Sequence, residues 1–285
     1  MIKKQLLNLM DNKTIKIGVA IIVRNTEIFM ESLMSNLSWV DEIYLYDDNS
    51  SDKTVEFAKK YTQVPLTIEK SANKKPVFGR GEIVVRNNVI NTAFEKLECD
   101  VLILIDGDEL ISPLLKDLII DKISGDDYDS ICFTTWHLYK KDKYLHFWET
   151  KINNVNLIDP HTRVIKKNKK FEKLFNDGSH PIINPTEKTY CTNGPFHFHL
   201  KYYKLSPYPN YALHFLPERI AEKDLYHYIK KLPFKLPNEV ENSLEKINWT
   251  KYNKLNTDYY KYYKSERKLS SSVKENLIHP KDKLL

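Results

Sequence analysis

Glycine is scarce in this 285-residue sequence, and no long hydrophobic run is present. Only seven glycines occur, and none lies in the turn at residues 23–27, after the first apolar segment. Dinucleotide-binding domains and sugar-nucleotide pyrophosphorylases carry a glycine-rich loop at that place, so both classes are disfavoured. No run approaches the roughly 18 apolar residues that a membrane-spanning helix needs, and we therefore expect a soluble protein.

Cysteine is also rare. Cys99, Cys132 and Cys191 are an odd number without paired spacing, which argues against a disulfide framework and fits a reducing compartment. The first ten residues contain two lysines but only a short apolar stretch without a small-residue cleavage site, so we expect no signal peptide. These features predict a cytoplasmic protein, and they leave open a peripheral position on the inner face of the membrane.

The net charge of +6 is unevenly distributed. Residues 201–285 hold 17 Lys and Arg against 10 Asp and Glu, whereas the first 200 residues hold 27 against 28. Eleven of the 18 tyrosines lie in the same basic region. Basic residues interleaved with aromatics suit an anionic membrane surface or nucleic-acid stacking, but they equally suit a solvated helical face. We favour the solvated face, keep peripheral membrane contact open and disfavour nucleic-acid binding.

The most informative stretch runs from a strand into an acidic turn. Residues 101–105 are all apolar, which is typical of a strand buried on both faces of a parallel sheet. Asp106, Asp108 and Glu109 follow directly. Ligands of open α/β sheets bind beyond the carboxyl ends of the strands, and carboxylates there suit Mg²⁺ or Mn²⁺ shared with a phosphate group. An acidic loop without a metal is the alternative reading of this pattern alone.

Further strand and helix patterns alternate along the first half of the chain. Residues 15–23 and 40–46 are apolar enough for strands, and residues 65–70 predict a third. The second strand leads into the acidic sequence at 47–54, in which Ser50, Ser51 or Asp52 can cap the next helix. Residues 81–97 predict a longer helix, whose Arg86 reaches inward, along the top of the sheet, or past the core to water.

The order of these motifs resembles the nucleotide-sugar half of family 2 glycosyltransferases of the GT-A fold. That family has an apolar strand, a D-D-x-S-x-D-x-T sequence, an R-N pair on a helix and a strand ending in D-x-D. Here they occur as residues 15–23, DDNSSDKT at 47–54, Arg86 with Asn87, and IDGDE at 105–109. The DGDEL form is similar to the D-A-D-E variant of bacterial lipopolysaccharide- and capsule-type transferases.

The resemblance implies roles for particular residues. Asp47 or Asp48 would contact the base and ribose of a nucleoside diphosphate, usually uridine, and Arg86 would approach the nucleotide. Asp106 and Asp108 would hold Mn²⁺ or Mg²⁺ together with the donor. Asn49 stands where the family often has glycine, and asparagine tolerates a turn with positive φ.

A later segment resembles the family more loosely. Arg163 and His180 fit the pattern, but Pro181 replaces an acidic residue. The catalytic base is therefore open between Asp177, His180 and Asp159. Asp177 leads, because the usual base of the family is a carboxylate.

The sequence FHFHL at 196–200 alternates strictly, so a strand there places His197 and His199 on one face. His199 could be a third metal ligand or contact the pyrophosphate. The alternative is a pair of edge-strand histidines that face water.

The combined expectation is an α/β protein of the GT-A fold. Residues 1–200 form the transferase domain, with a nucleotide-sugar half at about 14–125 and an acceptor half at about 126–200. Residues 201–285 form a basic, Tyr-rich, mainly helical appendage, with helices over 220–232 and 238–247.

The function implied by the resemblance is metal-dependent, inverting sugar transfer of the hexosyltransferase type. The donor would be a nucleoside diphosphate sugar, with UDP expected, and the acceptor a glycan, a lipid-linked molecule or a protein in surface glycan or glycoconjugate synthesis. A non-catalytic glycan- or partner-binding protein is the alternative. A phosphatase that uses the first aspartate of D-x-D as nucleophile is disfavoured, because Leu110 interrupts the D-x-D-x-T pattern of such enzymes.

Overall fold

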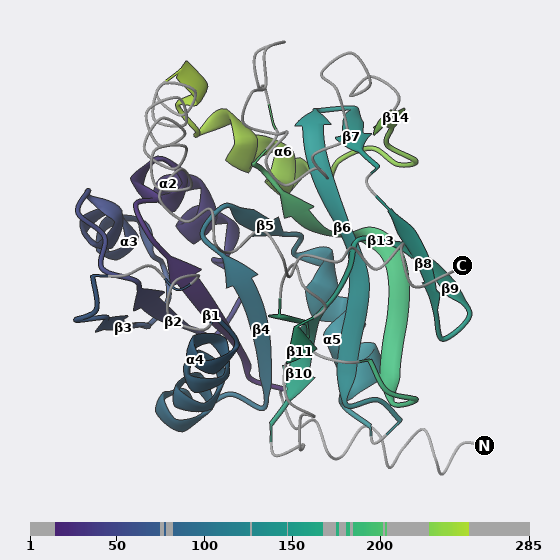
Figure 1. The fold of residues 1–285 in the computed structure, drawn as a ribbon, viewed down its shortest axis with the longest axis horizontal. Coiled ribbons are helices and arrows are strands. Elements are labelled where there is room, and N and C mark those ends of the chain that lie inside the picture. Colours follow the sequence, from purple (N-terminus) through teal and green to yellow (C-terminus); the bar gives the residue numbers. More distant parts are fainter. Residues whose placement is uncertain are drawn as a thin grey trace, which may run out of the picture.

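A mixed ten-stranded sheet runs through the protein, with helices on both of its faces (Figure 1). The computed structural model describes residues 15–74, 77, 82–125, 127–146, 148–167, 175–176, 181–182, 185–201, 203 and 228–250. This architecture is the mostly parallel central sheet flanked by helices that the sequence predicts.

The first half of the sheet consists of four parallel strands in the order β3-β2-β1-β4. They are β1 (Ile17–Val23), β2 (Glu42–Asp47), β3 (Leu66–Lys70) and β4 (Val101–Asp106). Their shared direction brings the carboxyl ends of β1, β2 and β4 to one edge of the sheet, where the acidic turns begin.

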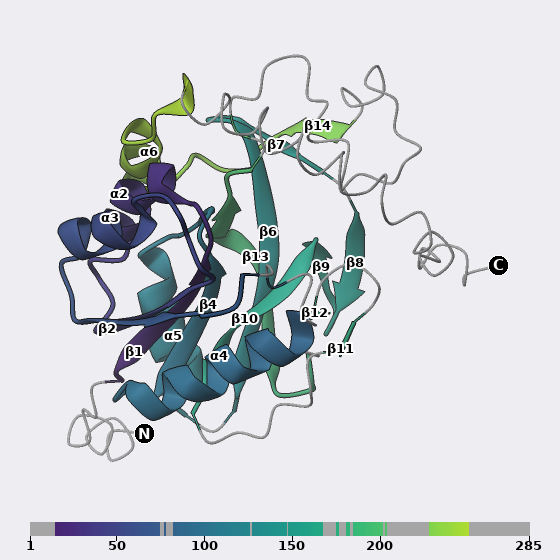
Figure 2. The same cartoon turned by 60° about the vertical axis from the view of Figure 1, so that its left-hand side comes forward.

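Helices cover both faces, which explains why the strands are apolar on both sides. They are α2 (Glu27–Asn36), α3 (Thr54–Tyr61), α4 (Glu82–Lys96), α5 (Leu114–Ile123) and α6 (Asn238–Glu245). Successive residues of β1 enter different cores: Val19 and Ile21 pack with α2, α3 and α5, whereas Ala20 packs with α4. Figure 2 shows α4 across the sheet from α2 and α3.

The second half of the sheet is mostly antiparallel. Its strands are β5 (Glu109–Ile111), β6 (Ser130–Lys140), β7 (Lys143–Leu145), β10 (Pro160–Lys166), β13 (Thr189–His199) and β14 (Ile229–Lys231). Strand β10 lies between β4 and β6, antiparallel to both. Strand β13 pairs with β6 in parallel and with β5 in antiparallel orientation. This double pairing carries the histidines of β13 toward the acidic end of β4.

Two short hairpins complete the described structure. They are β8 (Glu149–Ile152) with β9 (Val155–Ile158), and β11 (Phe175–Asn176) with β12 (Pro181–Ile182). The first hairpin leads directly into β10.

The described residues beyond position 200 pack against the preceding domain (Figure 1). Ser32 Oγ on α2 donates a hydrogen bond of 2.7 Å to the Ser243 carbonyl on α6, and Val240 and Leu244 are buried in the same core. Residues 238–245 are helical as expected, but residues 229–231, within the helix expected at 220–232, form β14 because they pair with β7. The division at residue 200 stays a prediction.

All three cysteines carry free thiols and are buried. Among the residues that the structure describes, no helix combines the length and apolar character needed to cross a membrane.

Candidate active site

Three of the hydrogen bonds that join the turn after β1 to the turn after β2 run from backbone N–H groups of the first turn to side chains of the second. The pairs are Asn25 to Ser50 Oγ (2.9 Å), Thr26 to Thr54 Oγ1 (2.8 Å) and Glu27 to Asp52 Oδ2 (3.1 Å). Asp52 Oδ1 also accepts from the Thr54 backbone N–H at 3.0 Å. Three polar residues of the DDNSSDKT motif therefore satisfy backbone donors and join the two turns.

Asp47 ends β2 and is fully buried. Its Oδ1 accepts the Ser50 backbone N–H at 2.9 Å. Its Oδ2 has no hydrogen-bond partner within the described part of the chain, and Lys70 Nζ lies 3.7 Å away. The motif thus contains one buried carboxylate oxygen whose hydrogen-bonding capacity is unused.

Asp48 is also buried and links two segments. Its Oδ2 accepts the Val77 backbone N–H at 2.9 Å, and Arg24 Nη1 donates to the Asp48 carbonyl at 2.6 Å. Asn49, which follows, has a φ of 60°, a conformation that asparagine tolerates. The acidic turn therefore holds a defined shape next to the end of β1.

Arg86 and Asp106 form the central ion pair of this sheet edge. Arg86 Nη1 and Nη2 donate to the two carboxylate oxygens of Asp106 at 2.8 Å and 3.2 Å, and Arg86 Nε donates to Glu82 at 2.8 Å. Burial alone would lower the pKa of Arg86, but the carboxylates of Asp106 and Glu82 raise it above its usual value. Of the three orientations that the sequence left open, the arginine therefore has the inward one, toward the end of β4.

Glu109 supports the D-x-D turn from inside the protein. Its side chain is almost completely buried, accepts the Asp106 backbone N–H at 2.8 Å and receives Arg163 Nη2 at 2.6 Å. Burial would raise the pKa of Glu109, but the guanidinium of Arg163 and then His197 hold it well below its usual range. The glutamate that follows the two aspartates thus fixes the turn that carries them.

Asp108 and His199 approach each other across the β5–β13 pairing. Asp108 Oδ2 lies 3.2 Å from His199 Nε2, and the Leu200 backbone N–H donates to the Asp108 carbonyl at 2.9 Å. Burial opposes ionisation of both side chains. Nevertheless, the pKa of Asp108 is lowered and that of His199 is raised, because each ion stabilises the other. Burial also lowers the pKa of nearby Lys201 to about 8.

His137 and Asp159 extend this contact across the sheet. His199 Nδ1 lies 2.9 Å from His137 Nδ1, and His137 Nε2 lies 2.6 Å from Asp159 Oδ2. His161 Nε2 is 3.5 Å from the same Asp159 oxygen. Asp159, a candidate base in the sequence, is thus held between two histidines.

The two histidines of β13 do not form a water-facing pair. His197 is fully buried, with Nδ1 3.1 Å from Thr135 Oγ1 and Nε2 3.2 Å from Glu109 Oε2. The contact between His197 Nε2 and Glu109 lacks hydrogen-bond geometry, so it is an electrostatic contact only. The water-facing alternative was wrong because β13 is not an outer edge: it pairs with both β5 and β6.

Sequence reasoning missed His137 and the supporting role of Glu109. His137 is one polar residue within a long strand and belongs to no motif. Its position beside His199 follows from the parallel register of β6 and β13, which pairs these two residues. Glu109 was visible next to the aspartates, but its partner Arg163 comes from β10, whose place in the sheet the sequence does not reveal.

The predicted metal ligands are only partly brought together. Asp108 and His199 converge, whereas both oxygens of Asp106 face Arg86. Within the described ranges, no group of three or more His, Cys, Asp or Glu side chains could hold a metal ion. Asp108 Oδ2 and His199 Nε2 could fill two coordination positions of a divalent ion, and the substrate would supply the other ligands. Asp177 and His180 lie outside the described residues.

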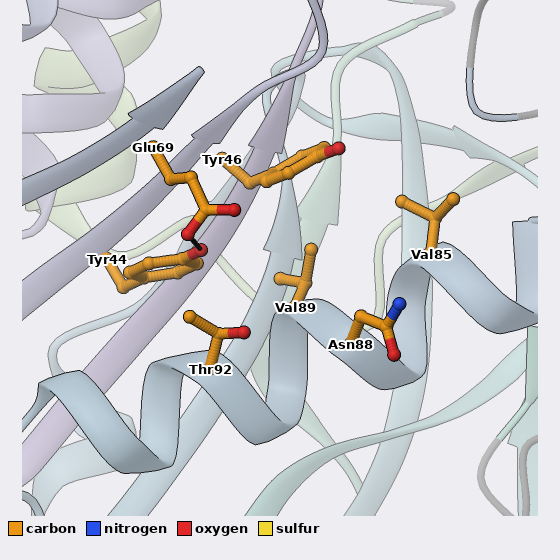
Figure 3. A pocket seen from close by; sticks show the side chains of 7 residues that line it. All are labelled: Tyr44, Tyr46, Glu69, Val85, Asn88, Val89 and Thr92. Atoms are coloured by element: carbon orange, nitrogen blue, oxygen red, sulfur yellow. Dashed lines mark hydrogen bonds between the residues drawn. The ribbon is translucent and has the colours of Figure 1, made fainter. Parts of the chain in front are cut away.

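A separate pocket of about 160 Å³ lies between β2, β3 and α4 (Figure 3). Its lining residues are Tyr44, Tyr46, Glu69, Val85, Asn88, Val89 and Thr92. The Tyr44 hydroxyl donates a hydrogen bond of 2.8 Å to Glu69. None of the predicted site residues lines this pocket, which is therefore distinct from the acidic edge of the sheet.

The sequence matches the model of a known protein family. The model of glycosyl transferase family 2 matches residues 19–182, more than half of the chain. The chain belongs to glycosyl transferase family 2, and its central sheet is of the expected GT-A type. No curated protein sequence matches it.

Two proteins of known structure are similar to this chain. S. aureus TarS, residues 1–349, is 15% identical, with a TM-score of 0.40, and the match covers 65% of this chain and 60% of that one. The same protein in complex with UDP is 16% identical, with a TM-score of 0.42 and the same coverage. Glucosyl-3-phosphoglycerate synthase from Mycobacterium tuberculosis, in complex with Mn²⁺, UDP and glucosyl-3-phosphoglycerate, is 16% identical. Its TM-score is 0.31, and the match covers 44% of this chain and 45% of that one.

Proposed function

We propose that this protein transfers a sugar from a nucleoside diphosphate sugar, with UDP as the expected nucleotide, to an acceptor hydroxyl. The observation that carries the proposal is the convergence of Asp108 Oδ2 and His199 Nε2, 3.2 Å apart, beside the Asp106–Arg86 pair. These groups meet at the carboxyl end of β4, where ligands of parallel sheets bind. Their carboxylate and imidazole groups would hold a divalent cation, whose positive charge a departing diphosphate requires.

Asp108 and His199 would hold Mn²⁺ or Mg²⁺, with Asp106 as a second acidic group that also contacts the donor. The ion, when bound, stabilises negative charge on the departing diphosphate as a Lewis acid. Arg86 keeps the Asp106 carboxylate in one orientation, and Glu109 holds the turn between the two aspartates. These contacts fix the two aspartates before substrate binds, so their side chains need little reorganisation during sugar transfer.

Asp47 and Asp48 would bind the base and ribose. The unused hydrogen-bonding capacity of Asp47 Oδ2 supports this role, because a buried carboxylate oxygen normally has a donor. Arg86, whose position is set by Asp106 and Glu82, would stand between the nucleotide and the metal-binding carboxylates.

Asp177 would act as the base that takes the acceptor proton, with His180 as the alternative. Asp159 is less suited to this role because two histidines already contact its carboxylate. Direct attack by the acceptor on the face opposite the diphosphate would invert the anomeric centre.

The cellular setting completes the proposal. The free thiols of all three cysteines favour the cytoplasm. The acceptor would be a glycan, a lipid-linked molecule or a protein in surface glycan or glycoconjugate synthesis.

Thermal unfolding tests the donor and the metal together. The protein is heated with UDP, GDP, CDP and their sugars, with Mn²⁺ or with EDTA. A ligand at 100 times its Kd stabilises the folded state by about 2.7 kcal/mol, which corresponds to roughly 5–10 °C for a domain of this size. We expect one nucleotide to give a shift that requires Mn²⁺.

Matched variants locate the binding site. Asp108→Asn and His199→Gln are expected to abolish the metal-dependent part of the shift. Asp117→Asn, which removes an exposed carboxylate on α5, is expected to retain it. If no nucleotide stabilised the wild type with or without Mn²⁺, the proposed donor class would be wrong.

A further inference from the structure

A line of three side chains crosses the sheet behind the proposed metal site. His199 on β13 lies beside His137 on β6, and His137 contacts Asp159, which directly precedes β10. Both histidines are largely buried, with 18% and 6% of their side chains exposed. Because so little water reaches them, the protons between these rings are determined by the protein.

The protons can be assigned from the Asp159 end. A carboxylate only accepts hydrogen bonds, so the nitrogen 2.6 Å away, His137 Nε2, carries a proton. Neutral His137 then has a bare Nδ1, which can only accept. The facing nitrogen, His199 Nδ1, lies 2.9 Å away and must donate. The second nitrogen of His199, Nε2, is thereby the one that remains for a proton or a metal.

We propose that Asp159 is a positioning residue: through His137 it holds the Nδ1–H form of His199, so that His199 Nε2 faces Asp108 Oδ2. A nitrogen lone pair and a carboxylate oxygen 3.2 Å apart repel each other unless a cation lies between them. The cation is a proton in the metal-free protein and a divalent ion in the proposed loaded state. The second step rests on the proposed function, whereas the tautomers do not.

The surroundings of His137 and Asp159 favour this assignment. Only 6% of the His137 side chain is exposed, and such burial favours the neutral form of the ring. Burial would raise the pKa of Asp159, but His161 and His137 hold it well below its usual range, so the carboxylate stays ionised. A cationic His137 would instead donate from Nδ1 to His199 Nδ1 and so reverse the one hydrogen bond between the two rings.

The backbone of Asp159 indicates a constrained position. Its φ is 42°, which non-glycine residues rarely adopt, and its backbone N–H donates to the Trp148 carbonyl at 3.2 Å. Such strain persists only where the surrounding structure holds a residue in place, and it is concentrated at functional sites. Here it directs the carboxylate at His137 Nε2.

Nitrogen-15 spectra of histidine-labelled full-length protein without metal test the tautomers directly. The signals are assigned with His137→Gln and His199→Gln. We expect a proton on His137 Nε2 and none on His137 Nδ1, with a proton on His199 Nδ1. A proton on His137 Nδ1, or a bare His199 Nδ1, would overturn the proposal.

Variants at position 159 test whether the Asp159 carboxylate determines the tautomers of His137 and His199. Asp159→Gly removes the carboxylate without backbone strain at positive φ. It is expected to give mixed tautomers of His137 and to weaken Mn²⁺ binding in the presence of UDP by about tenfold. Asp159→Asn keeps an oxygen acceptor, so it should preserve most of the wild-type tautomer. Unchanged His137 and His199 signals in Asp159→Gly would show that Asp159 has no such role.

The control removes another carboxylate that faces a histidine. Glu149 lies 3.6 Å from His146 at the far end of the sheet, and Glu149→Gln should leave the His137 and His199 signals unchanged. If Asp159→Gly did not fold, the wild-type spectrum alone would still overturn the proposal by showing a proton on His137 Nδ1 or a bare His199 Nδ1. If the wild type showed the assigned tautomers but bound no Mn²⁺, the proposed metal would fail while the role of Asp159 would stand.

Discussion

The guanidinium of Arg86 contacts both carboxylate oxygens of Asp106, at 2.8 Å and 3.2 Å. Arg86 comes from the first half of α4 and Asp106 from the last position of β4, so the pair joins a helix to the ligand-binding end of the sheet. A two-point contact fixes the plane of a carboxylate as well as its position. The first aspartate of D-x-D is therefore oriented before any ligand arrives.

Arg86→Lys keeps the positive charge but removes the two-point contact. We expect UDP binding in the presence of Mn²⁺ to weaken by about tenfold, the equivalent of one charge-assisted hydrogen bond. Titration calorimetry measures the change. Lys96→Gln, an exposed change in the last turn of the same helix, is the control and should bind as the wild type does. Equal affinities for wild type and Arg86→Lys would show that the orientation of Asp106 is unimportant.

Glu109→Gln tests the ion pair under the D-x-D turn. The change leaves the buried guanidinium of Arg163 without its closest partner, now 2.6 Å away. Breaking a buried pair from one side typically costs about 3 kcal/mol or more of unfolding free energy. Denaturant unfolding measures this loss, and Glu187→Gln at an exposed site is the control. In the double variant with Arg163→Met, the loss should be smaller than the sum of the single losses; strict additivity would contradict the coupling.

Asp52→Ala and Asp47→Asn separate two roles within the DDNSSDKT motif. Asp52 accepts backbone N–H groups from Thr54 and Glu27, so its loss should lower the unfolding free energy by about 1–3 kcal/mol. Asp47→Asn should mainly weaken UDP binding. Both variants are measured by unfolding and by nucleotide titration. A purely catalytic role for Asp52 would leave its variant as stable as the wild type, against this expectation.

Much of the sheet could be predicted from local sequence. Continuous apolar runs marked β1, β2 and β4 because both of their faces are covered, and the polar turns between them marked the ligand-binding edge. Asn49 stands where the family often has glycine, and its φ of 60° is one that asparagine tolerates. These features depend on neighbours in sequence, which a single chain displays.

The contacts of the site depend on strands that meet only in the folded sheet. Arg163 reaches Glu109 because β10 inserts between β4 and β6, and His137 reaches His199 because β6 and β13 run in parallel register. No local pattern encodes either pairing. The helix predicted over residues 229–231 was wrong for the same reason: these residues form a strand because they pair with β7.

Gly18→Ala tests the close approach of β1 to the segment that precedes β4. A Cβ at position 18 would lie 2.9 Å from both Cys99 Sγ and Leu97 Cδ1, which are buried and cannot move aside freely. Overpacking of this kind costs about 1–3 kcal/mol. We expect that loss in denaturant unfolding, with partial recovery in the double variant that adds Cys99→Ala, because Leu97 remains in contact.

Gly125→Ala is the matched control for this substitution. The nearest atom to its added Cβ is the Asp127 backbone nitrogen at 4.0 Å, so there is space for a methyl group. Its stability should equal or slightly exceed that of the wild type, because alanine restricts the unfolded chain more than glycine does. If both glycine variants were equally stable, the apposition of β1 to Leu97 and Cys99 would be looser than these distances state. The register that places Asp106 beside Ile22 of β1 would then lack one of its constraints.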